Sequence, residues 1–214
     1  MTQLERNSSI LKKYIPEQAI YPIANWIIQF DFKLKIKRGR ATKYGDYRQP
    51  VKSLNHRITI NHDLNKFAFL ITLVHEIAHL VNWNKYKNAV KPHGPEWKQE
   101  FKLLMRHFMS ETVFPADILH ALTQYMQNPV ASSCSDAHLM RTLKKYDNKP
   151  DVILLEQLSL NTVFKTSTDR YFIKGEKRRT RFLCRELRTK RDYLFSALAE
   201  VYSAEGPIGY KGLY

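Results

Sequence analysis

The sequence predicts an α+β protein in which helices pack on a short β-sheet, followed by a small antiparallel β module. Three observations lead to this prediction. In most of residues 11–126, apolar residues recur at the spacing of helices that pack on a core. Two short segments within that range alternate instead between apolar and polar residues, which is typical of strands. Residues 151–201 consist of short alternating pieces separated by turn-forming residues.

The first segments of the chain predict a helix, a strand and a connection. Residues 11–30 carry apolar residues at helical spacing, and Pro16 suits the first turn of that helix. Residues 32–37 alternate apolar residues with lysines, which predicts a half-buried strand with one basic face. Residues 38–50 contain two glycines and a proline, and they predict a turn-rich connection.

The longest predicted helix lies between two polar segments. A short strand is expected at residues 57–61, and Asp63 after it is the expected N-cap of the helix. The helical pattern fades after Trp83, and the asparagines and proline of residues 84–92 predict a loop. Pro95 fits the opening turn of the next helix, whose apolar residues follow at helical spacing.

One further helix and a domain boundary complete the N-terminal part. Residues 114–126 predict a helix that stops before a proline, and small polar residues follow it. We therefore expect a first domain at residues 1–127, a linker at 128–150 and a small basic β-rich module at 151–214.

The predicted module consists of short strands joined by turns. Three of its aromatic residues, Tyr171, Phe172 and Phe182, suit stacking on single-stranded bases, but they serve equally well as a small core. The final segment, residues 206–214, has no readable period. The predicted strands are residues 163–165, 170–173, 179–184 and 193–195.

The composition is that of a globular protein. With 214 residues and 43% hydrophobic content, the chain can bury one good core, or a main domain and a small appendage. No apolar run has the length of a membrane span and the start has no apolar signal segment, so we expect a cytoplasmic protein without a membrane partner. Its two cysteines, Cys134 and Cys184, fit a reducing compartment and are too few for a disulfide framework.

The net charge of +15 is concentrated in two segments. Residues 31–60 hold nine basic residues against two acidic ones, a net charge of +7, and residues 174–191 have the same balance. Charge runs are usually solvated faces, but two such blocks with interleaved aromatic residues also fit a phosphate backbone. We therefore expect DNA or another nucleic acid as a partner, bound without sequence preference.

The most informative segment is His75-Glu76-Ile77-Ala78-His79 in the long helix. Residues four apart lie on the same face of a helix, so His75 and His79 can direct both imidazoles at one ion. Glu76 lies beside the pair, where a carboxylate can take a proton from a zinc-bound water as that water attacks a carbonyl. A histidine pair that only packs in the core is the alternative. The apolar flanks argue against it, because they bury the helix and leave its polar groups in need of partners.

A catalytic zinc ion needs a third protein ligand and a fourth position that stays open to water. Four downstream residues are candidates: His93, Glu96, Glu100 and His107. We favour His93, because it lies where a loop turns into a helix and Gly94 leaves room for its side chain to swing toward the motif. Glu96 or Glu100 would instead supply a helical carboxylate. His107 lies in the apolar stripe of its helix and is expected to pack there.

These segments resemble the SprT-like metalloprotease family, which includes the Spartan proteases that degrade proteins crosslinked to DNA. The resemblance covers residues 11–127. It rests on the motif segment 72–79, on the His-Gly-Pro-Glu-Trp segment at 93–97, and on the strand 57–60 before the motif helix.

The resemblance implies a small zincin-like domain that holds one catalytic zinc ion. Its pattern makes His75, His79 and His93 the zinc ligands and Glu76 the general base. Many members end in a four-cysteine zinc ribbon, which the two cysteines of this chain cannot form. A second, structural zinc ion is therefore not expected.

We expect a zinc-dependent endopeptidase that acts on nucleic-acid-associated proteins, with a zinc-bound water activated by Glu76. An extended substrate could pair with a free edge of the strand 57–61, and Tyr86 or another loop group could stabilise the oxyanion. One alternative is a nucleic-acid-binding or transcription-related regulator with a structural zinc ion. Another is a zinc hydrolase that acts on small amides.

Overall fold

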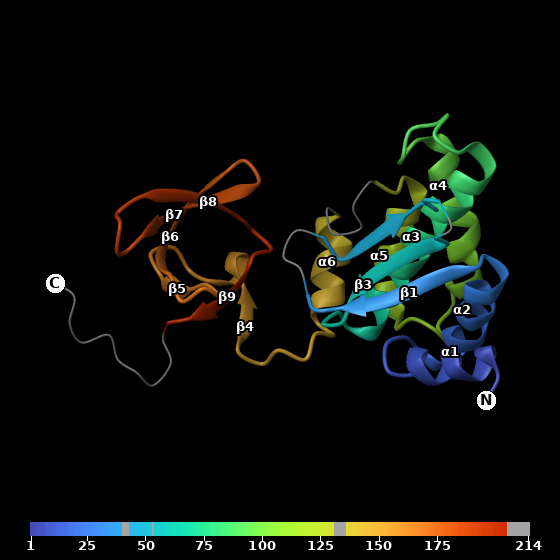
Figure 1. Cartoon of the computed structure of the whole chain (residues 1–214). Coiled ribbons are helices and arrows are strands. Elements are labelled where there is room, and N and C mark those ends of the chain that lie inside the picture. Colours follow the sequence, from blue (N-terminus) through green and yellow to red (C-terminus); the bar gives the residue numbers. More distant parts are fainter. Residues whose placement is uncertain (40–42, 53, 131–135, 205–214) are drawn as a thin grey trace. The chain divides into compact units, whose positions relative to one another are not determined.

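The residues described by the computed structural model of the chain are 1–39, 43–52, 54–130 and 136–204. The chain divides into two compact units, Met1–Asp147 and Asn148–Tyr214 (Figure 1). Arg40 of the first basic block, Cys134 and the segment 206–214 lie outside the described residues. Within the described part, no helix combines the length and the apolar character needed to cross a membrane.

The helix expected at residues 11–30 begins only at Glu17, because residues 12–16 are not helical. Pro16 occupies the N-cap of the second helix, and a proline disfavours helical backbone in the residue before it, so the chain turns there. The first helix was not predicted. Thr2 and Glu5 form its capping box, in which each side chain accepts a hydrogen bond from the other residue's N–H. The α-helices of this unit are α1 (Gln3–Leu11), α2 (Glu17–Gln29), α3 (Lys66–Tyr86), α4 (Pro95–Met105), α5 (Ala116–Gln127) and α6 (Ala137–Lys144), with a 3-10 helix η1 (Arg106–Phe108) after α4.

The sheet of this unit has three strands in the order β1-β3-β2. β3 (His56–Asn61) pairs in parallel with β1 (Phe32–Lys37) and antiparallel with β2 (Gly45–Arg48), so it is the central strand. β1 and β3 confirm the two predicted strands. β2 was missed, because residues 38–50 were expected to form a turn-rich connection. Its four residues are too few to show a period, and it is its pairing with β3 that defines it as a strand.

Helix α3 lies at the centre of the core. It contacts β2, β3 and α4, so apolar side chains nearly all round the helix are buried, as its sequence predicted. In Figure 1 the strands pass in front of it.

The N-cap of α3 is Asn65, and not Asp63 as the sequence predicted. The Asn65 side-chain oxygen accepts hydrogen bonds from the N–H groups of Phe67 (3.2 Å) and Ala68 (2.9 Å).

The N-terminal unit extends beyond the predicted boundary. Residues 128–150 were expected to be a linker, but α6 forms within them and packs against α5. Leu139 and Leu143 of α6 are buried in the same core as α3. The side-chain amide of Asn65 also donates to the Leu143 carbonyl (2.9 Å) and to the Asp147 carboxylate (2.6 Å). These contacts join α6 to the first unit, which therefore ends at Asp147.

The second unit is an antiparallel sheet in the strand order β4-β9-β5-β6-β7-β8. Every neighbouring pair is antiparallel, as the sequence predicted for this part of the chain. Its strands are β4 (Val152–Leu154), β5 (Val163–Lys165), β6 (Tyr171–Arg178), β7 (Arg181–Glu186), β8 (Asp192–Ser196) and β9 (Glu200–Ser203), with a 3-10 helix η3 (Leu155–Gln157) after β4.

The aromatic residues of this unit form its core. Phe172 is 1% exposed and Phe182 is 8% exposed, and both pack in a cluster with Phe164. The suggestion that these two rings stack on bases is therefore wrong, because both are buried. Tyr171 is half-buried.

An internal ion pair also stabilises the second unit. The Arg170 guanidinium donates to the Glu186 carboxylate (2.8 Å), the Thr189 hydroxyl donates to the same carboxylate, and Glu186 is only 2% exposed. The hydrogen bonds from Arg170 and Thr189 lower the pKa of Glu186 to about 2. Since this pKa lies below the ordinary value of 4.5, the pair stabilises the fold fully above pH 4.5 and loses its effect as the pH falls toward 2.

Replacing Glu186 with Gln is expected to destabilise the second unit near neutral pH. Amide hydrogen exchange in β6 and β7 should be faster than in the wild type at pH 7, and the difference should shrink as the pH falls toward 2, where Glu186 is protonated in the wild type as well. Asp169→Asn is the control, because Asp169 is 82% exposed in its pair with Lys165. A difference that stays constant down to pH 2 would show that the ion pair is not its cause.

Candidate metal centre

Helix α3 places the predicted motif residues at one cleft. His75 and Glu76 are buried, with 5% and 7% of their surfaces exposed, and His79 is half-buried. The rings of His75 and His79 lie with their centroids 5.0 Å apart. The spacing of four residues therefore brings both imidazoles to the same place, as the sequence predicted.

His93 reaches this pair from the turn that precedes α4. The N–H of Gly94 donates to the carbonyl of Lys91 (3.0 Å), which closes the turn. The His93 ring centroid lies 4.5 Å from that of His79 and 5.4 Å from that of His75. The possible ligand atoms of the three histidines all lie within 4.8 Å of one another, so the group could hold a metal ion.

Burial keeps the three imidazoles neutral. Burial and the neighbouring histidines lower the pKa of His75 to about 2. Burial, followed by the charge of His93, lowers the pKa of His79 to about 3. Burial also lowers the pKa of His93. Neutral imidazoles have a free lone pair, which is the form that binds a metal ion.

The hydrogen bonding of the cluster also fits a metal ion. His75 Nδ1 and His93 Nε2 are buried, and neither has a hydrogen-bond partner in the protein. A buried polar atom without a partner costs about 1–3 kcal/mol. A bound ion would satisfy one nitrogen of each ring, and zinc is commonly held by three histidines.

Trp97 supports all three histidine rings, a role that the sequence did not reveal. Its side chain is completely buried. It lies edge-on to His75 (4.6 Å between centroids) and to His93 (4.8 Å), and it stacks against His79 (5.3 Å). From the sequence, Trp97 was expected only to belong to the apolar stripe of its helix. Its position in the segment that carries His93 was the one available signal.

The other candidate ligands lie outside the cluster. Glu96 and Glu100 do not belong to the group of possible ligand atoms found in the described residues. The Glu100 carboxylate instead accepts a hydrogen bond from Lys85 Nζ (2.6 Å). His107 was expected to lie within a helical apolar stripe, but α4 ends before it and its side chain is exposed, with its ring edge-on to Trp26.

A cleft of about 400 Å³ opens above the histidines, between α3, β2 and the loop before α4. Tyr47 of β2 lines it, whereas Tyr86, the residue suggested by the sequence, does not. The Tyr47 hydroxyl lies 2.9 Å from His56 Nδ1, and its ring is nearly parallel to that of His79. Burial raises the pKa of Tyr47, so the hydroxyl keeps its proton.

Gly45 lies directly against the buried carboxylate of the motif. A Cβ atom at Gly45 would be 2.5 Å from Glu76 Oε1 and 2.8 Å from Thr72 Cγ2. Any side chain at position 45 would displace the Glu76 carboxylate, so the observed arrangement requires glycine there. The sequence did not reveal this contact, because Gly45 was assigned to a turn and its neighbour is distant in the chain.

The free edge of the sheet at the cleft belongs to β2. The sequence suggested that the strand 57–61 offers a free edge, but β3 has a partner strand on each side. β2 has β3 on one side and no strand on the other in the described part of the chain, and Gly45, Asp46 and Tyr47 line the cleft.

The model of the SprT-like family matches residues 13–120, which is half of the chain. The chain belongs to the SprT-like family. The match includes α3, the turn with His93 and α4, and it ends before the second unit begins. SprT-like proteins are typically metallopeptidases and are generally associated with zinc. No curated protein and no solved structure gave a match.

Proposed function

We propose that this SprT-like protein is a zinc-dependent endopeptidase in which His75, His79 and His93 hold the metal ion. The observation that carries the proposal is the convergence of three neutral, buried or half-buried imidazoles beside the Glu76 carboxylate at an open cleft. A structural zinc site is usually closed by four protein ligands, whereas this group supplies three.

Zinc bound there would act as a Lewis acid on the substrate carbonyl and on water. Glu76 lines the same cleft as the three histidines, and we assign to it the role of the general base that would accept a proton from water and donate it to the leaving amine. Its carboxylate lies close to Gly45, which has no side chain that would displace it. The Tyr47 hydroxyl is our candidate for the donor that stabilises the oxyanion, because it keeps its proton and its residue lines the cleft.

An extended peptide is the substrate form that suits this cleft. The open edge of β2 offers main-chain N–H and C=O groups beside the histidines, and a substrate paired there would be held by its main chain. Such binding selects extended, accessible segments and depends little on side chains. We therefore propose broad sequence tolerance.

Gly45→Ala is expected to reduce proteolysis by about tenfold to a hundredfold without loss of zinc, because a displacement of about 1 Å at a reacting group can cost a factor of 10². The added methyl group would overlap Glu76 Oε1 and displace it. Peptidase rates and zinc content measured on the same sample test this. Gly39→Ala is the matched control, since its Cβ would overlap the carboxylate of the exposed Asp63, and neither residue lines the cleft. A Gly45 variant with full activity would show that Glu76 can move without consequence.

The proposed function is tested by zinc analysis of the purified protein together with cleavage of casein and of histones. One equivalent of zinc and cleavage that stops with a chelator would support it. A zinc-loaded protein that cleaves neither protein, with or without DNA, would favour a regulator with a structural zinc ion. Cleavage of small amides alone would favour a small-amide hydrolase.

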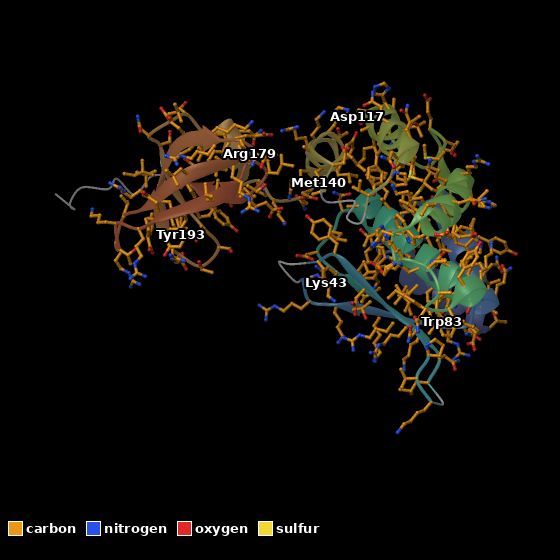
Figure 2. The ribbon with its side chains drawn as sticks, turned by 90° about the horizontal axis from the view of Figure 1, so that it is seen from above. Lys43, Trp83, Asp117, Met140, Arg179 and Tyr193 are labelled. Carbon is orange, nitrogen blue, oxygen red and sulfur yellow. The ribbon has the colours of Figure 1, made fainter. Side chains whose placement is uncertain are left out.

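We also propose that nucleic acid binds the basic surface of the second unit. Lys174 is buried and Arg185 pairs with Asp192, so these two cations of the block 174–191 are already engaged. Others are exposed at the turn between β6 and β7, where Arg178 lies directly opposite Arg181. Like charges in this arrangement destabilise a hairpin, and phosphate groups would relieve the repulsion. Arg179, labelled in Figure 2, occupies the turn itself.

Reversing the charge of Lys177, Arg178 and Arg179 is expected to weaken binding of single-stranded and duplex DNA and to reduce its dependence on salt. The reason is that fewer counterions are released when fewer phosphates are contacted. Fluorescence anisotropy at two salt concentrations measures both effects. Charge reversal at Lys12 and Lys13, which are exposed on the first unit, is the control. Unchanged affinity in the first variant would move the interface away from this turn.

A further inference from the structure

A second groove lies in the first unit, between α1 and the edge strand β1. Its volume is about 820 Å³. One face of α1 contributes Ile10 and Leu11, β1 contributes Leu34 and Ile36, and the segment before β3 contributes Leu54. Ile10 is 53% exposed and Leu54 is 66% exposed, so the groove has apolar walls that are open to solvent.

The edge of β1 beside this groove is open. β1 pairs with β3 on one side and has no strand on the other side in the described residues. The Lys37 carbonyl accepts a hydrogen bond from the His62 N–H (2.8 Å), just after β3, so it points toward that strand. Alternate residues of a strand direct their main-chain groups to opposite edges. The N–H and C=O groups of Leu34 and Ile36 therefore point to the open edge.

A side chain of α1 adds an unsatisfied donor to the same groove. Asn7 lines it, and Asn7 Nδ2 is buried without a hydrogen-bond partner. Such a donor costs free energy unless an acceptor reaches it. Because that atom has almost no exposed surface, an acceptor in the groove reaches it only if the Asn7 side chain turns outward.

The opposite face of β1 carries three lysines without compensating charge. Lys33, Lys35 and Lys37 alternate along β1 with the apolar Leu34 and Ile36, and Lys33 also borders the groove. Within the described part of the chain, no ion pair is found for the three lysines. Burial and the neighbouring cations, with Arg57 first among them, lower the pKa of Lys35. The lysines therefore repel one another, and an added strand would place its own side chains directly beside them.

We propose that the open edge of β1 takes up an extended segment of a partner protein, in which apolar residues alternate with Asp or Glu. The segment adds a strand to the sheet through the main chain of Leu34 and Ile36. Its apolar residues enter the groove between α1 and β1, and its acidic residues pair with Lys33, Lys35 and Lys37 on the other face.

The lysines also argue against a second copy of this chain as the occupant. If β1 paired with β1 of another copy, lysines would face lysines across the new ladder, and like charges directly opposite destabilise a pair of strands. Lysine on an edge strand discourages such self-association. The carboxylates of an acidic strand would instead be attracted to the three lysines.

The test uses synthetic peptides of about ten residues, the upper length of an ordinary strand, on the full chain carrying Glu76→Gln so that no peptide is cleaved. One peptide alternates Val with Glu, the second alternates Val with Lys, and the third is the Val–Glu peptide methylated at alternate main-chain nitrogens. Fluorescence anisotropy should show binding of the first peptide alone. Amide hydrogen exchange at Leu34 and Ile36 should slow when it binds, because these N–H groups become paired.

Two variants locate the binding. Reversing the charge of Lys33, Lys35 and Lys37 should weaken binding of the Val–Glu peptide about tenfold, since three exposed ion pairs together contribute about 1–2 kcal/mol. The same variant should gain affinity for the Val–Lys peptide. Leu54→Asp should also weaken binding, without unfolding the protein, because Leu54 is largely exposed. The matched control reverses the charge of Lys12, Lys66 and Arg106, three exposed cations of the first unit that do not line the groove.

Several results would overturn the proposal. They are equal binding of the methylated peptide, equal binding of the Val–Lys peptide, or no loss in the lysine variant. Displacement of the peptide by single-stranded DNA from this same edge would identify the lysines as a phosphate site instead. Dimerisation that disappears with Leu54→Asp would identify a second copy as the occupant. None of these results depends on peptidase activity.

Discussion

Glu76→Gln is expected to retain zinc and to lose proteolysis. Glutamine has the shape of glutamate and fits beside Gly45, but its amide cannot accept the proton of the attacking water. A general base contributes about 10²–10⁴-fold to the rate, and the loss should be of this size. Because the substitution leaves the three histidines in place, zinc content should equal that of the wild type. Zinc analysis and casein cleavage on one preparation measure both quantities.

Glu96→Gln is the control for this variant. Glu96 is half-buried and lies outside the cluster, so its amide form should cleave casein at the wild-type rate. If the Glu76 variant cleaved as fast as the wild type, the proton would have to pass to another group. If it lost zinc as well as activity, the carboxylate would be needed for the metal site and its role as a base would be untenable.

His93→Ala is expected to weaken zinc binding by more than about 100-fold, because even groups that only support a ligand contribute about 10–100-fold to metal affinity. The variant removes one of the three converging imidazoles and leaves His75 and His79 on α3. Zinc retained after dialysis against a chelator, measured by mass spectrometry, gives the result directly. Proteolysis should be lost to the same extent as zinc.

His107→Ala is the matched control for the third ligand. His107 is a histidine of the same unit, but it is exposed, contacts Trp26 and lies outside the cluster. Its zinc content should not change. Full zinc content in the His93 variant would place the third ligand elsewhere in the chain and would remove the main support for the proposed site.

The parts of the site that could be predicted from the sequence are those set by the spacing of residues along the chain. His75 and His79 share a helix face because they are four residues apart, and this holds wherever the helix is placed. His93 was favoured because it lies at a helix entry, and the three rings do converge in the folded chain.

The contacts that could not be predicted from the sequence join segments that are distant in the chain. Gly45 lies against Glu76, and it belongs to a strand that is too short to be recognised from its sequence. Trp97 packs against three histidine rings, two from α3 and one from the turn before α4. The buried rings of Phe172 and Phe182 were equally compatible with a core and with a binding surface. Local residue patterns do not distinguish such cases, because the difference lies in which segments meet.

The sequence by itself determined the α+β class, the family and the set of histidines and glutamate from which a metal site can be built. These follow from residue types and short-range spacing, which the chain carries before it folds. Only the tertiary structure decided that β3 is central, that the open edges belong to β1 and β2, and that α6 belongs to the first unit. Strand order and helix packing depend on burial summed over many distant contacts, and no single segment encodes that sum.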